Sequence, residues 1–187
     1  MNFDIKPLSP ETWNDFEELF GPKGAYGGCW CMWWRLTKSK FDKNQGAGNR
    51  QALRELVDQG KPTGLIAYID DQPMGWCSVA PREDYGSLER SRILKRIDNK
   101  QVWSIVCFFI NKQHRGKRLG LSLIKGAIQY VSDQGGKILE AYPTVVRGKE
   151  LPPVSSFMGI PKIFEEAGFK EEARPSEAKM IMRYNIS

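Results

Sequence analysis

Apolar positions recur at two spacings along the chain, and the spacing predicts where helices and strands lie. Apolar residues three or four positions apart, as on one face of a helix, occur over 10–20, 49–59, 119–134 and 161–167. Alternating or continuous apolar runs of strand length occur over 3–8, 63–70, 74–81, 101–110, 137–142 and 179–186. Helices and strands interleaved in this order predict an α/β (α+β) fold with a mixed sheet.

Capping and turn residues mark the ends of several predicted elements. Ser9 as N-cap and Pro10 at the first helical position start the first helix, and Gly21 ends it. The residues Asp70 to Pro73 separate two apolar runs and predict a hairpin. The run 101–110 is almost wholly apolar, so we expect a strand buried on both faces.

Three segments lack a regular pattern. Residues 21–40 combine glycines with aromatic residues, and 143–156 form a proline-rich connection. Residues 87–98 (SLERSRILKRID) read as a short charged helix or an ordered excursion.

Length and hydropathy predict a single domain over residues 1–187. The chain is 41% hydrophobic, and this length supports one sizeable core. The first residues lack a signal-peptide pattern, and no run approaches the roughly 20 apolar residues of a membrane span. We therefore expect a cytoplasmic protein without a membrane partner.

Charge and cysteine usage narrow the function classes. The formal charge of +6 favours an anionic partner but is modest for nucleic-acid binding, and no nucleic-acid motif is present. Cys29, Cys31, Cys77 and Cys107 lack the paired spacing of a zinc site, and His114 is the only histidine. We expect buried, reduced thiols and no metal.

The stretch NKQHRGKRLGLSLIKGAI, residues 111–128, joins a buried strand to an amphipathic helix through a basic loop that contains Gly116. A helix start presents unpaired N–H groups and the positive end of the helix dipole, which suits phosphate. Arg115, Lys117 and Arg118 add cations. The alternative is a solvent-exposed basic helix start without a ligand.

This stretch resembles motif A of the Gcn5-related N-acetyltransferases (GNAT), whose pattern is Q/R-x-x-G-x-G/A. Gln113 and Gly116 match the pattern, whereas Arg118 stands where it has Gly or Ala. The element order and the A-G-F at 167–169 also resemble this family over nearly the whole chain. More narrowly, CWCMWWR, VWSIVCFFI and EAYP resemble a subgroup of bacterial members.

The resemblance implies a single GNAT-like domain in which two parallel strands, 101–110 and 137–142, splay apart to admit acetyl-CoA as cosubstrate. It implies main-chain contacts to pantetheine from Phe108 and Ile110. It also implies a diphosphate site with these members: Gln113, Arg115, Gly116, Lys117, Arg118, Leu119 and Gly120.

The usual catalytic pair of the family does not carry over by position. The strand 101–110 contains no carboxylate, and Phe164 stands where a tyrosine acid is often found. Glu140, in an otherwise apolar strand, is our candidate base, because desolvation favours the protonated form of a carboxyl group. Tyr142 is the candidate acid, Glu83 and Asp84 are weaker base candidates, and Glu140 on an exposed face is the alternative.

In this family the segment between the first two helices commonly forms a wall of the acceptor pocket. In this chain that segment is CWCMWWR. We expect Trp33, Trp34 and Arg35 to bind a small amine, with Arg35 holding a carboxylate, although tryptophans more often serve as core. The predicted function is an N-acetyltransferase; the alternative is a catalytically silent CoA-binding or regulatory module. The sequence leaves the acceptor and the oligomeric state open and allows a homodimer.

Overall fold

A computed structural model describes residues 3–115, 118–145 and 157–187 of the chain. Its centre is a seven-stranded sheet in the order β1-β2-β3-β4-β5-β7-β6. Neighbouring strands are antiparallel, except for β4 and β5, which are parallel. The predicted mixed α/β sheet is therefore confirmed.

The strands and helices follow the predicted order closely. The strands are β1 (Asp4–Pro7), β2 (Leu65–Ile69), β3 (Gln72–Pro81), β4 (Trp103–Ile110), β5 (Ile138–Ala141), β6 (Lys170–Ser176) and β7 (Lys179–Asn185). The α-helices are α1 (Trp13–Phe20), α2 (Lys38–Lys43), α3 (Ala47–Asp58), α4 (Gly86–Glu89), α5 (Leu119–Asp133) and α6 (Pro161–Glu166). Short helical turns lie at η1 (Gly24–Gly28), η2 (Arg82–Asp84) and η3 (Lys112–His114).

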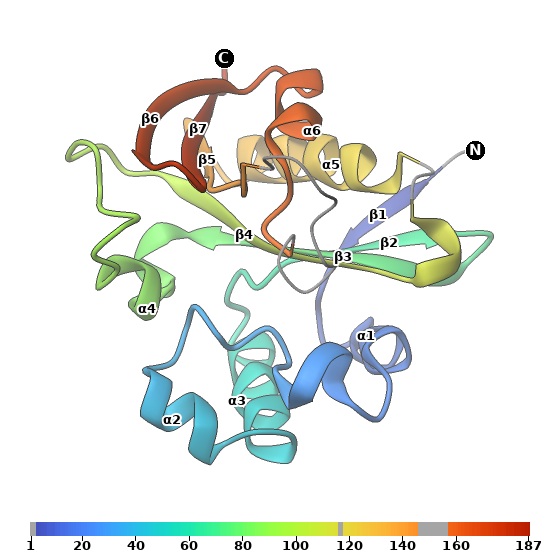
Figure 1. Ribbon diagram of the computed structural model, residues 1–187. Coiled ribbons are helices and arrows are strands. Elements are labelled where there is room, and N and C mark those ends of the chain that lie inside the picture. Colours follow the sequence, from blue (N-terminus) through green and yellow to red (C-terminus); the bar gives the residue numbers. More distant parts are fainter. Residues whose placement is uncertain (1–2, 116–117, 146–156) are drawn as a thin grey trace.

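Helices cover both faces of the sheet (Figure 1). Helices α5 and α6 lie on one face, where Leu123, Ile124 and Ala127 of α5 are completely buried. Helices α1 and α3 lie on the opposite face, where Phe16 packs edge-on against Trp76 of β3. The two apolar helix faces thus bury the two faces of one sheet.

Strand β5 pairs in parallel only with the first three residues of β4. Trp103 pairs with Leu139 and Ile105 with Ala141, whereas β4 continues to Ile110 without β5 beside it. A β-bulge interrupts β4 just past this point, because Cys107 is opposite Ser78 and Ile105 is opposite Val79. The strands therefore separate where the family resemblance implies a splay.

A third apolar cluster lies where the two strands part. It includes Val106 of β4, Tyr142 just after β5 and Ile181 of β7, with Trp34 and Phe157 packed at its margin. Helices α1 to α4 lie on this same side of the sheet (Figure 1). We call it the acceptor face, because the family resemblance predicts that the segment containing Trp34 binds the acceptor.

Four details differ from the sequence predictions. Helix α1 begins at Trp13 instead of Pro10, because Ser9 and Thr12 form a turn in which Thr12 Oγ1 accepts from Ser9 N at 2.9 Å. Helix α2 was not predicted, although Thr37 caps it by accepting from Lys40 N. The charged edge strand β6 was also missed. The second half of β4 is only half-buried, because β5 does not cover it.

Among the described residues, no helix is long and apolar enough to cross a membrane. In the same part of the chain, no group of histidine, cysteine or acidic side chains is arranged to hold a metal ion. All four cysteines are free: Cys31 and Cys77 are buried, whereas Cys29 and Cys107 are half-buried.

Candidate active site

A cavity of about 260 Å³ opens between the first turn of α5 and helix α6. Its walls include Ile110 at the end of β4 and the helix-start residues Leu119 and Gly120. An added Cβ at Gly120 would lie 2.8 Å from the flexible end of Ile163, so the absence of a side chain here leaves the cavity wider. The predicted residues Ile110, Arg118, Leu119 and Gly120 thus share one cavity.

Arg118 stands where motif A has Gly or Ala, and its backbone is in the left-handed conformation. Its φ of 64° and ψ of 8° lie in the left-handed region, which glycine adopts without steric cost. The exposed Arg118 side chain contacts Glu166 of α6 with an Nη2 to Oε2 distance of 3.4 Å. An exposed ion pair of this kind contributes little, so its guanidinium is easily released to another anion.

The other described cofactor candidates, Phe108, Gln113 and Arg115, are not among the residues that line this cavity. Phe108 N donates to Phe157 O at 2.6 Å on the side of β4 that β5 leaves uncovered. Arg115 Nε donates to Ile110 O at 3.3 Å, and the exposed Gln113 donates through its main chain to Asn111 Oδ1. The predicted contacts at Gly116 and Lys117 lie outside the described residues.

The candidate catalytic residues Glu140 and Tyr142 belong to a buried ionic network. Both are almost completely buried, as is Arg82. Glu140 Oε1 accepts from Arg82 Nη1 at 2.9 Å and from the Tyr142 hydroxyl at 2.6 Å. Glu140 Oε2 accepts from Arg183 Nε at 2.7 Å. Two guanidinium groups therefore hold this carboxylate.

The Tyr142 hydroxyl is also fully engaged. It donates to Glu140, accepts from Arg82 Nη1 at 2.7 Å and lies 2.7 Å from Ser104 Oγ. Burial raises the pKa of Tyr142 well above its ordinary value, and the Glu140 carboxylate raises it further. These contacts favour a structural role for both residues, so general base and acid catalysis by this pair stays a prediction.

The weaker base candidates belong to the short turn η2. Glu83 is exposed and forms a 3.6 Å ion pair with Arg96, and Asp84 ends the short turn η2. Ionisable groups at the bulge of β4 are instead thiols: hydrogen bonding with Cys107 lowers the pKa of the Cys31 thiol to about 7. Trp76 Nε1 also donates to Cys31 Sγ at 3.2 Å.

The predicted acceptor residues lie at different depths. Trp33 is exposed and packs edge-on against Phe41, whereas Trp34 packs at the margin of the cluster on the acceptor face. The Arg35 guanidinium lies 4.6 Å from the Tyr85 ring centroid, and its Nη2 donates to Pro62 O at 3.2 Å. Trp34 Nε1 and Arg35 Nε are buried donors without a hydrogen-bond partner among the described atoms.

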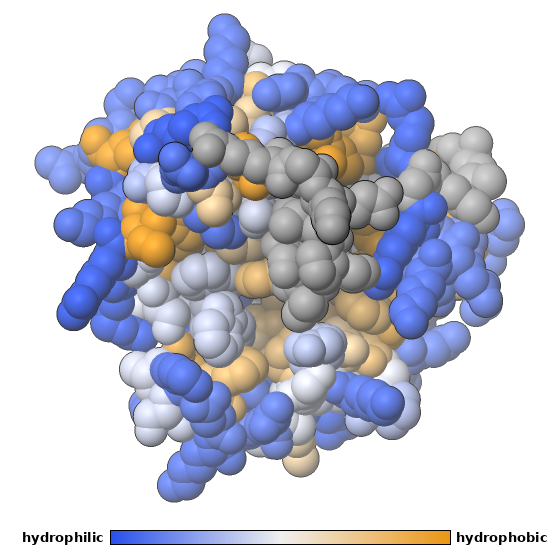
Figure 2. Space-filling view, in the orientation of Figure 1, coloured by the Kyte–Doolittle hydropathy of each residue, from blue (hydrophilic) through white to orange (hydrophobic). Residues whose placement is uncertain are grey.

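The surface between the two helical layers is hollowed near its middle (Figure 2). Orange and pale residues border this hollow, whereas blue residues cover most of the periphery. The apolar and aromatic composition of the border suits the binding of an organic molecule.

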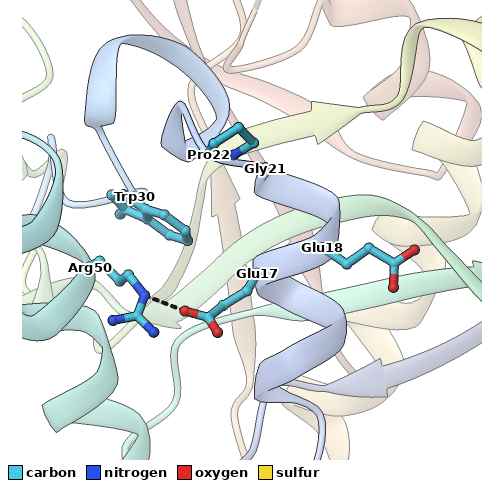
Figure 3. A pocket seen from close by; sticks show the side chains of 6 residues that line it. All are labelled: Glu17, Glu18, Gly21, Pro22, Trp30 and Arg50. Carbon is cyan, nitrogen blue, oxygen red and sulfur yellow. Dashed lines mark hydrogen bonds and ion pairs between the residues drawn. The ribbon is translucent and has the colours of Figure 1, made fainter.

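A larger hollow, of about 540 Å³, lies elsewhere, between α1 and α3 (Figure 3). Glu17 forms an ion pair with Arg50 across it, Trp30 forms part of its wall, and Glu18 points away. No strand contributes to its lining among the described residues, and neither does the first turn of α5. Its size therefore does not make it the active site.

Three further residues at these sites were not predicted. His114 and Lys162 line the cavity at α5, and His114 Nδ1 is buried without a partner among the described atoms. Lys179 of β7 is half-buried on the acceptor face. The basic loop could have suggested His114, but no local signal marks Lys162 or Lys179, since isolated lysines are ordinary surface residues.

Comparisons with known proteins agree with this geometry. The family model "Acetyltransferase (GNAT) family" matches residues 30–147. No curated protein sequence matches the chain. The narrower resemblance to a bacterial subgroup stays a prediction.

Solved structures share the fold along the whole chain. A GNAT-family protein from Desulfovibrio desulfuricans has 16% identity and a TM-score of 0.58, with 100% of both chains covered. The PaiA N-acetyltransferase from Thermoplasma acidophilum, in complex with coenzyme A, has 16% identity and a TM-score of 0.55, with 99% of each chain covered. The YncA protein of Salmonella typhimurium, with its cofactor acetyl-CoA, has 13% identity and a TM-score of 0.54, covering 99% of this chain and 94% of that one.

These likenesses establish the shared fold, and the family model covers more than half of the chain, including the splayed strands and the first turn of α5. The chain therefore belongs to the GNAT family of acetyltransferases.

Proposed function

We propose that this protein is an acetyl-CoA-dependent N-acetyltransferase that acts on the amine of a small molecule. The observation that carries the proposal is the separation of β4 from β5 beside the cavity at the first turn of α5. Solved relatives hold coenzyme A or acetyl-CoA, which supports the same cosubstrate here. The cytoplasmic location and a homodimer stay predictions.

The described residues fit a phosphorylated, elongated cosubstrate. Arg118, Lys162 and His114 bring basic groups to a cavity whose other walls are mainly apolar. The buried, unpartnered His114 Nδ1 suits a hydrogen bond to a ligand or to water. Main-chain groups of Ile110 and Phe108 would bind the pantetheine, and at Phe108 this requires displacement of the Phe157 carbonyl.

Acetyl-CoA supplies an activated acyl group when it is bound, and the residues of this chain must orient the amine and accept its proton. The two buried donors Trp34 Nε1 and Arg35 Nε support an acceptor with oxygen atoms near the CWCMWWR segment, because unpaired buried donors are costly. Proton removal by Glu140 requires release of a carboxylate that two guanidinium groups hold. Proton transfer to solvent is the simpler route.

A second candidate function is a catalytically silent CoA-binding or regulatory module. One specific observation favours it: Glu140 and Tyr142 are occupied by the buried network, and Phe164 at the family's tyrosine position is completely buried. A silent module would bind the cofactor through the same cavity without turnover.

Two measurements separate these functions. We expect isothermal titration of the full chain to give micromolar or tighter affinity for CoA and acetyl-CoA. We then expect acetyl-CoA-dependent thiol release with at least one amine of a broad acceptor panel. Tight binding without release would favour the silent module, and absence of binding would contradict both proposals.

A further inference from the structure

Lys179, the first residue of β7, is half-buried, and its ammonium group has only neutral partners among the described residues. Its Nζ donates to Thr144 Oγ1 at 2.9 Å and to Met158 Sδ at 3.5 Å. No carboxylate lies within ion-pair distance of this nitrogen in the described residues 3–115, 118–145 and 157–187. Burial lowers the pKa of Lys179, as expected for a desolvated cation.

This arrangement calls for an anion. An ammonium group has three donors and no acceptor, and a thioether is a weak acceptor. Proteins rarely bury a lysine without a counter-charge, because desolvation of an unpaired cation is costly. Glu140, the buried carboxylate of the described residues, is already paired with Arg82 and Arg183.

Strand alternation orients Lys179 toward the acceptor face. Lys179 and Ile181 lie two residues apart on β7, and Ile181 belongs to the cluster that contains Val106 and Tyr142. Met180, between them, belongs to the core on the α5 side. Lys179 is also absent from the lining of the cavity at α5, so the cofactor phosphates are not its natural partner.

We propose that Lys179 is a specificity-determining residue that binds the carboxylate of an amino-acid-like acceptor. The inference rests on the proposed acetyltransferase function. A carboxylate carries one negative charge, which a single ammonium group neutralises, whereas a phosphate dianion would need a second cation. The apolar groups nearby, Val106, Trp34 and Phe157, suit the hydrocarbon part of such an acceptor.

Lys179 is better suited to this contact than Arg35, the residue predicted from the sequence. The Arg35 guanidinium lies against the Tyr85 ring and donates to the Pro62 carbonyl. Its remaining buried donor, Nε, offers one hydrogen bond instead of a bidentate contact. Arg35 therefore orients the loop, and Lys179 provides the charge.

The test compares matched acceptors with and without a carboxylate: L-phenylalanine with phenethylamine, and L-leucine with isoamylamine. We expect wild type to prefer the carboxylated member of a pair. Lys179→Met should lower kcat/KM for that member about tenfold to hundredfold through KM, as loss of a charged hydrogen bond does. Its kcat/KM for the plain amine and its KM for acetyl-CoA should stay within about twofold of wild type.

Matched controls keep the outcome clear. Lys179→Arg should keep much of the preference, and Lys170→Met, at an exposed lysine of β6, should keep all of it. Thermal unfolding should show that Lys179→Met is as stable as wild type or more stable, because it removes a desolvated charge; Lys179→Gln provides a second folded variant.

The outcomes distinguish this inference from the function on which it rests. Turnover of no amine at all would overturn both. A second outcome is that wild type acetylates plain amines and that Lys179→Met lowers kcat/KM equally for both members of a pair. This outcome would overturn the carboxylate assignment alone. Loss of the preference in Arg35→Met but not in Lys179→Met would do the same.

Discussion

At the residue scale, Glu140 has two possible roles, as a general base and as a member of a buried ionic network. Its position in an apolar strand predicted a desolvated general base, and it is indeed almost completely buried. However, Arg82, Arg183 and Tyr142 occupy its two oxygens. Removing one member of a buried ion pair leaves the other charges uncompensated, which is more costly than the loss of an exposed contact.

We therefore expect Glu140→Gln to destabilise the protein by about 3–5 kcal/mol, as broken buried ion pairs do. Urea unfolding measures this change, and initial rates with acetyl-CoA measure kcat under conditions where the variant is folded. A general base predicts the opposite pattern: unchanged stability with a loss in kcat of about a hundredfold. Glu165→Gln, at an exposed carboxylate of α6, is the control and should change stability by less than about 0.5 kcal/mol.

At the element scale, the first turn of α5 and the side chains of α6 enclose the cavity next to β4. Gly120 lies in this turn, and a Cβ there would approach only the flexible ends of Ile163 and Ile110. Alanine is therefore tolerated after a small shift and has a higher helix propensity than glycine by about 1 kcal/mol. A larger side chain would fill the cavity.

We expect Gly120→Leu to fold and to weaken CoA binding at least about tenfold, or about 1.4 kcal/mol. Gly120→Ala is the matched control and should bind CoA nearly as wild type does. Isothermal titration measures both affinities, and circular dichroism checks the fold. Wild-type affinity in a folded Gly120→Leu protein would mean that the cofactor binds elsewhere.

At the scale of the whole molecule, the ionic network connects segments that are distant in the sequence. Asp98, in the segment between α4 and β4, forms two hydrogen bonds with Arg183 of β7, at 2.6 and 3.0 Å. The Arg183 guanidinium lowers the pKa of Asp98 to about 2. In the unfolded chain the pKa of an aspartate is about 3.9. A carboxyl group whose pKa is lower in the folded protein stabilises the fold at pH values above the unfolded pKa. This stabilisation is lost as the pH falls toward the pKa of the folded protein.

We expect the unfolding free energy of wild type to decrease between about pH 4 and pH 2 more steeply than that of the Asp98→Asn variant. The reason is that the variant has no carboxyl group at this position to take up a proton. Urea unfolding at a series of pH values gives both curves. They should differ most at neutral pH and converge near pH 2. Parallel curves would contradict the linkage; Glu172→Gln, at an exposed position of β6, serves as the control.

The sequence by itself determined most elements and several of the residues that share the cavity at α5. Apolar periodicity identified α5 and the strands β2 to β5, because each buries a regular face against one core. The loop before α5 identified Arg118, Leu119 and Gly120, since a motif of consecutive residues keeps its local geometry in any member of a fold family. By contrast, β6 lacks an apolar pattern because it lies at the sheet edge, where solvent satisfies its polar side chains.

Only the tertiary structure decided which side chains meet at the acceptor face. Arg82, Glu140 and Arg183 are far apart in the sequence, and strand pairing brings their charges together. Strand pairing also places Lys179 beside Thr144. There its ammonium group is partly desolvated, and no carboxylate of the described residues forms an ion pair with it. The physical reason is that desolvation and charge pairing depend on neighbours in space, whereas periodicity and local motifs depend on neighbours along the chain.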